Sequence, residues 1–341
     1  MKKILTIALV AVLAATSVFA GVNFSGNFRQ GYKFTFAEGK DFASAAWKTE
    51  ESKLSIKATD DNGIWTISLK NTGALDSANK WAANASVSLT KLLAAAGVDT
   101  GDFSLALSIG NNAKMAGLSA YNDVTGNEYY KLKNNGKESF QLAAAYGKLV
   151  KFNIAVDPTN KDGNKPSTVV SVLTEPVSGV SVAADYAFRG YFDDAAGVGS
   201  VTADHMIGAS AKVDIKKLAD LDFMLNVSAF DNIALGDSKV NSFAVAVEAG
   251  VDAVDGFVEF AMKNAENANV YALNTQVNFN VVENLGLDAY FNIANLEKTG
   301  DTFSVGADVS YKLSGVQFAL NAEYARADKA FTVTPKMIIA F

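Results

Sequence analysis

Residues 331–341 read FTVTPKMIIAF. Side chains of a β-strand alternate between its two faces, so this stretch would form a strand with one apolar face. That face carries Phe331, Val333, Pro335, Met337, Ile339 and Phe341, whereas Thr332, Thr334 and Lys336 lie on the other face. An apolar strand with an open edge is a template for aggregation. We therefore expect both edges of this strand to be paired, as they are in a closed barrel.

The same alternation recurs along the chain. Residues 22–36 place aromatic side chains on one face and mostly polar ones on the other. Residues 54–58 and 65–69 flank Asn62 and Gly63, a pair that favours a tight hairpin turn. Residues 91–97 could form one helical turn, but no helix of ordinary length competes with the strands. Further strands are expected at 82–89, 103–110, 139–146, 151–157, 167–174, 180–188, 205–213, 223–230, 240–249, 257–263, 269–280, 287–294, 302–312, 315–325 and 330–341.

Residues 1–20 have the features of a secretory signal peptide. Lys2 and Lys3 precede an apolar run over residues 4–18, and small residues precede the expected cleavage point after Ala20. The mature chain is therefore expected to begin at Gly21. Without the two lysines, 28 basic residues face 36 acidic residues, which gives a net charge of −8. This acidic balance argues against a nucleic-acid partner.

If residues 21–341 cross a membrane, they are expected to do so with strands. No apolar run there approaches the roughly 20 residues of a helical span, and the chain has no cysteine for a lipid anchor or a disulfide. Phe24 and Phe34 would lie about 33 Å apart along a strand. A strand tilt of about 40° reduces this distance to about 25 Å, the height of the apolar band of an outer-membrane barrel. We expect an all-β fold, one antiparallel transmembrane barrel of about 18 strands (16–20 possible), with short periplasmic turns and longer external loops.

The alternating end of the chain, with its final aromatic Phe341, resembles the C-terminal signature of bacterial outer-membrane β-barrel proteins. The layout of the strands resembles that of the general diffusion porins. The resemblance implies an integral protein of the outer membrane of a diderm bacterium, surrounded by lipid, whose last strand is read by the barrel-assembly machinery. It also implies a homo-oligomer that lets small hydrophilic solutes diffuse through a water-filled lumen. A second hypothesis is a barrel that anchors adhesive external loops, although the loops expected at 37–51, 158–166 and 190–204 are short for that role.

Charged side chains are expected on the face that would line the lumen. The first strands offer the basic residues Arg29, Lys33, Lys53, Lys57 and Lys70, and the late strands offer the acidic residues Glu248, Glu259, Asp288, Asp308 and Glu323. In the general porins, which this chain resembles, such charges at a constriction set a transverse field that acts on solutes. The alternative is that these charges only solvate the lumen and pair across the barrel seam, for instance Arg29 or Lys33 with Glu323.

Residues 111–138 form the longest stretch without clean alternation. One hypothesis is a loop that folds into the lumen and narrows it, as the third external loop does in the general porins. Tyr121, Tyr129 and Tyr130 would then pack on the barrel wall, and Asp123, Glu128, Lys131 and Lys133 would face water. The other hypothesis is an additional hairpin, which would give 20 strands and a wider lumen.

The sequence does not favour an enzyme or a cofactor. His205 is the only histidine, and the adjacent Asp204 would point to the opposite face of a strand, although a catalytic base needs a partner within hydrogen-bond reach. Residues 157–165 lack the alternating oxygen ligands of a calcium loop, because Pro158 and Lys161 interrupt them. The sequence contains no phosphate-binding glycine loop, metal cluster or haem motif.

Overall fold

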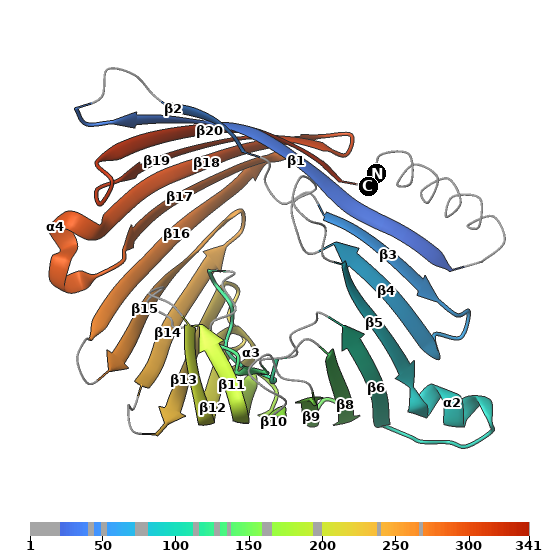
Figure 1. Ribbon diagram of the computed structural model, residues 1–341. Coiled ribbons are helices and arrows are strands. Elements are labelled where there is room, and N and C mark those ends of the chain that lie inside the picture. The colour runs from blue at the N-terminus through green and yellow to red at the C-terminus, as the bar shows by residue number, and fades with distance from the viewer. Residues whose placement is uncertain are drawn as a thin grey trace.

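The computed structural model describes residues 21–39, 44–48, 53–71, 81–111, 116–125, 130–134, 138–158, 166–193, 200–236, 240–265 and 269–340. Most of these residues lie in strands of one antiparallel sheet (Figure 1). The wall consists of β1 (Val22–Ala37), β3 (Lys53–Thr59), β4 (Trp65–Asn71), β5 (Trp81–Ser88), β6 (Phe103–Asn111), β8 (Glu138–Tyr146), β9 (Val150–Asp157), β10 (Ser167–Val177), β11 (Val180–Asp193), β12 (Ser200–Asp214), β13 (Met224–Leu235), β14 (Val240–Val251), β15 (Val254–Ala265), β16 (Val270–Val282), β17 (Leu285–Ile293), β18 (Phe303–Leu313), β19 (Val316–Ala325) and β20 (Ala330–Ala340).

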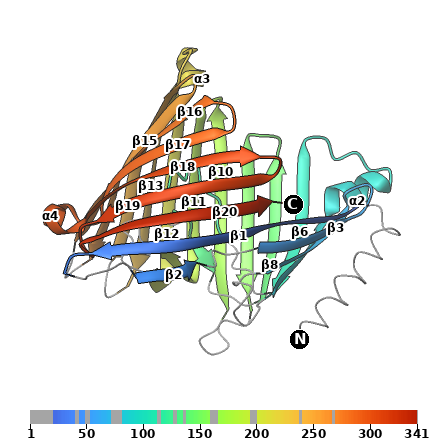
Figure 2. The ribbon, with the colours of Figure 1, turned by 90° about the horizontal axis from the view of Figure 1, so that it is seen from above.

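The sheet closes because its first and last strands pair with each other. β20 pairs with β19 on one edge and with β1 on the other, from Asn27 opposite Ala340 to Ala37 opposite Ala330. β1 pairs with β3 on its second edge. The result is a closed antiparallel barrel of 18 strands, which confirms the predicted fold. Figure 2 shows the strands crossing the wall obliquely, as closure of a twisted sheet requires.

Two expected loops were too long. Residues 44–48 form β2 (Ser44–Lys48), which pairs with the second half of β1, so the loop expected at 37–51 is wrong. The many polar residues of that stretch hid a short alternation that places Trp47 opposite Tyr32. The loop expected at 190–204 is also wrong, because β11 continues to Asp193 and β12 begins at Ser200. A kink at Arg189, whose φ is 52°, interrupts the pattern without ending the strand.

The two rims of the barrel differ in their connections. The N-terminal rim, where β1 begins and β20 ends, carries the turns 60–64, 147–149, 178–179, 252–253, 283–284 and 314–315. It also carries α2 (Leu89–Ala95), which overlaps the expected helical turn, and α3 (Ile215–Ala219), which the sequence did not suggest. The opposite rim carries η1 (Leu296–Lys298) and α4 (Thr299–Thr302). Within the described ranges, no helix is long and apolar enough to cross a membrane.

The two faces of the wall differ in polarity. Val258, Leu320 and Phe318 on the outer face are 52%, 44% and 51% exposed. The lumen face carries buried polar side chains, among them Ser171 and Ser210, which contact a segment inside the barrel. Because strand side chains alternate, these contacts fix which residues of each strand point inward. The barrel therefore has an apolar exterior and a polar interior.

Candidate functional site

The segment between β6 and β8 lies inside the ring of strands (Figure 1). β6 pairs directly with β8, from Phe103 opposite Tyr146 to Asn111 opposite Glu138, so this segment places no strand between them. Within it, the two-residue β7 (Lys133–Asn134) pairs with Gly190 and Tyr191 of β11, next to the point where the pairing of β10 with β11 begins at Phe188. The hypothesis of an additional hairpin and 20 wall strands is therefore wrong. We call residues 116–125 and 130–134 the inward segment.

Main-chain groups of the inward segment bind polar side chains of the wall. Leu118 N donates a hydrogen bond to Ser171 Oγ at 2.9 Å. Ala120 N and Ser119 Oγ both donate to Ser210 Oγ at 2.9 Å. The wall thus supplies hydrogen-bond partners to a stretch of backbone that has no strand neighbour there.

Apolar side chains of the inward segment pack in two clusters with residues of the lumen face. Tyr121 and Tyr130 pack on Phe230, with ring centroids 4.9 and 6.4 Å from it, and on small alanines of the neighbouring strands. Leu132 is fully buried and packs in a second cluster that contains Phe192 and Met206. These contacts attach both parts of the segment, residues 116–125 and residues 130–134, to the side of the wall formed by β10–β16.

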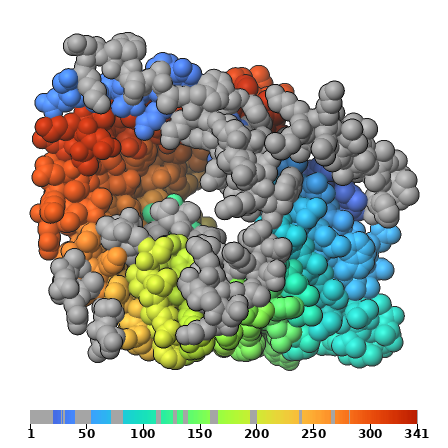
Figure 3. Space-filling model, viewed as in Figure 1, coloured from blue at the N-terminus to red at the C-terminus, as the bar shows by residue number. Residues whose placement is uncertain are grey.

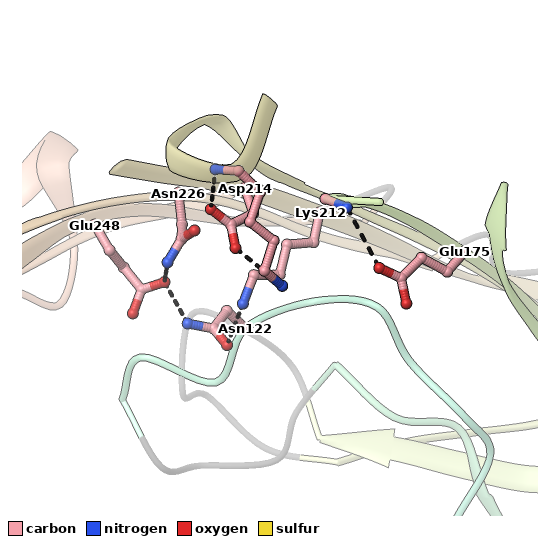
Figure 4. A network of polar contacts seen from close by, with 8 residues as sticks. Asn122, Glu175, Lys212, Asp214, Asn226 and Glu248 are labelled. Carbon is pink, nitrogen blue, oxygen red and sulfur yellow. Dashed lines mark hydrogen bonds and ion pairs between the residues drawn. The ribbon is translucent and has the colours of Figure 1, made fainter. Parts of the chain in front are cut away.

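Asn122 of the inward segment takes part in the network of polar contacts shown in Figure 4. Asn122 donates through Nδ2 to Glu248, and Lys212 Nζ donates to Asn122 Oδ1 at 3.2 Å. Asn226 Nδ2 lies 3.5 Å from the same carboxylate oxygen of Glu248. Since Lys212, Asn226 and Glu248 lie near the ends of their strands at the N-terminal rim, the segment extends through much of the barrel height.

Glu259 is a second acidic residue that contacts the inward segment. Its side chain is fully buried; Tyr121 OH donates to one carboxylate oxygen, and Asn274 Nδ2 donates to the other at 2.8 Å. The sequence assigned Glu248 and Glu259 to the lumen face, and the structure places them there beneath the segment. Alternation alone could not identify Tyr121 and Asn122 as their partners, because these lie more than a hundred positions earlier in the chain.

A polar cavity of about 340 Å³ separates the inward segment from the late strands. Thr125 of the segment borders it on one side. The lining from β15–β19 comprises Phe257, Asn274, Gln276, Tyr290, Asn292, Asp308 and Glu323. Tyr290 OH donates to Glu323 Oε2 at 2.6 Å, and Asn321 Nδ2 donates to Tyr290 OH at 3.3 Å. The segment and the late strands thus face each other across a space that can hold water or a solute.

An acidic row runs beside this cavity. Asp288 lies directly opposite Asp308 on the neighbouring strand, and Asn278 lies opposite both Asp288 and Asp255. Asn278 Nδ2 donates to Asp255 Oδ1 at 2.6 Å. Like charges opposite each other on adjacent strands are unfavourable for folding. Such a local cost is typical of positions that serve a function rather than stability.

Basic side chains lie on the lumen face of the early strands. Lys57 pairs with Asn23 and Ser68, and both Lys57 and Lys70 are exposed. Arg29 and Lys33 share the inward face of β1 and are partly buried. The side chain of Lys53 lies outside the described residues. The early and late strands therefore present opposite charges inside one barrel.

The remaining expected site residues are those of the predicted constriction loop and the C-terminal Phe341. Lys133 is 12% exposed and forms an ion pair with Asp193 at 3.1 Å, and Lys131 Nζ lies 4.9 Å from the centre of the Tyr130 ring. Asp123 is partly buried. Tyr129, Glu128 and Phe341 lie outside the described residues. The two described lysines thus contact the segment and the wall instead of simply facing water.

Solved structures with a similar fold include a porin. The chain matches OpdQ of Pseudomonas aeruginosa with a TM-score of 0.58 and 8% identity, over 94% of this chain and 97% of that one. A mutant of the Rh. blastica porin matches with a TM-score of 0.50 and 12% identity, over 94% and 100% of the two chains. The chain has the porin fold. No protein-family model and no curated protein matches the sequence. The likeness to these structures therefore concerns the fold, and function has to be argued from the lumen.

His205 and Asp204 have separate partners in this porin-like barrel. His205 Nδ1 lies 2.7 Å from Tyr186 OH, and Asp204 Oδ1 lies 3.4 Å from Arg189 Nε. Among the residues that the structure describes, no three His, Cys, Asp or Glu side chains are grouped to hold a metal ion.

Truncation of Leu132 is expected to loosen the inward segment. Leu132→Ala removes a fully buried side chain and should weaken the attachment by about 2–5 kcal/mol. Hydrogen exchange at Gly117 N, which donates to Leu132 O at 2.8 Å, should accelerate while exchange in the wall strands does not. Leu320→Ala on the outer face is the matched control. Unchanged exchange at Gly117 would contradict the packing described above.

Proposed function

We propose that this chain is an outer-membrane porin through which small hydrophilic solutes diffuse passively. The observation that carries the proposal is the polar cavity of about 340 Å³ between Thr125 of the inward segment and the late strands. Figure 3 shows an opening in the middle of the barrel. A barrel of 18 strands encloses more volume than its own side chains fill. A polar lumen of this width conducts water-soluble molecules unless a plug closes it, and the inward segment lies against one side of the wall.

The narrowest passage is proposed to lie beside the inward segment. Thr125 and, on the opposite side, Asp308 and Glu323 border the same cavity. The basic side chains Arg29, Lys33, Lys53, Lys57 and Lys70 would supply the opposite charge. Solutes would then cross a transverse field whose acidic side is formed by Asp288, Asp308 and Glu323, while Glu248 and Glu259 hold the segment in place.

The same proposal covers the export, membrane insertion and assembly of the chain. Residues 1–20 would be removed on export, and residues 21–341 would insert into the outer membrane of a diderm bacterium. Phe341 would be part of the signal for the barrel-assembly machinery. Asp123, Glu128, Lys131 and Lys133 would belong to the constriction. Several copies would associate into a homo-oligomer in the lipid, and the chain would act as a channel without catalysis.

Liposome swelling tests passive diffusion. Liposomes that contain the purified protein should swell in isotonic solutions of small sugars, at rates that fall steeply as the sugar becomes larger. Liposomes without protein provide the control. Equal and negligible swelling in both would favour the alternative of a barrel that only anchors its external loops.

A further inference from the structure

α2 and the residues that follow it form an apolar projection at the N-terminal rim. Leu92, Leu93 and Val98 are 49%, 44% and 48% exposed. The residues between them, 94–97, are three alanines and a glycine, so this stretch itself carries no polar side chain. In Figure 1, α2 projects away from the ring of strands. We call Leu92, Leu93 and Val98 the α2 patch.

Hydrogen bonds fix the orientation of α2 relative to the wall. Ser88, the last residue of β5, accepts a bond from Lys91 N at 3.3 Å. Thr90 is buried, and its hydroxyl accepts from Leu105 N at 3.1 Å and donates to Leu105 O at 3.3 Å. The Lys91 ammonium lies next to the turn at Gly63. These bonds hold the first turn of α2 against β6.

The apolar exterior of the barrel extends to the level of α2. Several strands end at the N-terminal rim in an apolar residue that is more than half exposed. They are Tyr146 at 56%, Val177 at 58%, Val251 at 59%, Val282 at 57% and Leu313 at 56%. Phe103, which begins the strand after α2, is 45% exposed on the same outer face and lies opposite Tyr146. The α2 patch thus lies at the rim where this apolar outer surface ends, next in sequence to Phe103.

We infer that the α2 patch lies in the interfacial layer of the bilayer leaflet at the N-terminal rim, with lipid as its occupant. The inference rests on the proposed function, because the wall must be in a membrane for lipid to reach this level. Apolar side chains that adjoin a lipid-facing wall gain free energy by entering the boundary between headgroups and acyl chains, while Lys91 and Asp99 can remain in water. The helix would then help to set the depth of the barrel in the bilayer.

The chain contains no cysteine, so single cysteines can be labelled cleanly. Nitroxide labels would be attached to Leu93→Cys, Val98→Cys and the control Lys91→Cys in the full-length protein, reconstituted in phospholipid bilayers. Oxygen, which partitions into lipid, and a water-soluble nickel chelate would be used as relaxation agents. The ratio of oxygen to nickel accessibility should be severalfold higher at positions 93 and 98 than at 91.

Equal ratios at positions 91, 93 and 98 would overturn the inference. Labels at 93 and 98 that neither agent reaches would also overturn it, because they would show that protein covers the patch. Val258→Cys on the outer wall separates this inference from the proposed function. A lipid-type ratio at 258 with a water-type ratio at 93 refutes only the inference, whereas a water-type ratio at 258 refutes both.

Discussion

Deletion of residues 116–133 should raise the single-channel conductance severalfold. The inward segment packs on the wall formed by β10–β16 and borders the cavity at Thr125, so its removal should widen the proposed path. The barrel should still form, because β6 and β8 pair with each other without help from the segment. Conductance would be measured in planar bilayers, and folding by the heat-dependent shift of the protein in detergent gels.

A deletion outside the lumen, at the rim where β6 and β17 end, gives the control for this experiment. Residues 296–302 form η1 and α4, which project away from the ring of strands (Figure 1). Their shortening should leave the conductance unchanged. If the deletion of 116–133 left the conductance unchanged as well, the segment would not be the constriction. Loss of the folded barrel would show that the segment is required for the wall, contrary to the direct pairing of β6 and β8.

Neutralisation of the lumen charges should change ion selectivity in opposite directions. Asp288→Asn together with Asp308→Asn removes two carboxylates that face each other beside the cavity and should lower the preference for cations severalfold. Lys57→Gln together with Lys70→Gln removes positive charge from the opposite side and should raise that preference. Both effects should decrease with increasing salt, because exposed charges are screened. The measurement is the reversal potential in a potassium chloride gradient.

Glu297→Gln is a suitable control for selectivity, since this exposed residue lies in η1 outside the lumen. Its reversal potential should equal that of the unaltered protein. A shift of the same sign in the aspartate and lysine variants would contradict a field between two oppositely charged walls. An unchanged reversal potential in both variants would show that the conducting path lies away from the aspartates and from the lysines.

The strands were predictable because each has one apolar and one polar face. The period of two located the C-terminal strand, and closure followed because an apolar strand such as 331–341 needs partners on both edges. The same rule failed at residues 44–48, where polar neighbours hide Trp47, and at Arg189, where a local kink imitates a strand end. In both places pairing with a neighbouring strand overrides the local pattern.

The lumen was predictable only as a list of residues that point inward. Alternation assigned Glu248 and Glu259 to the interior, but their partners Asn122 and Tyr121 belong to a segment with no period of its own. Tyr290 carried a usable signal, because it shares its face with Asp288 on β17. The contacts of the inward segment depend on how an irregular chain folds back on a distant wall, and no periodic feature of one sequence encodes that.

The central claim is that a water-filled path crosses the folded barrel beside the inward segment. Single-channel recording of the unaltered protein in planar bilayers tests it most directly. The account predicts discrete current steps that increase in proportion to salt concentration at high ionic strength. A protein that shows the heat-dependent gel shift of a folded barrel, and yet gives no steps when inserted, would contradict it.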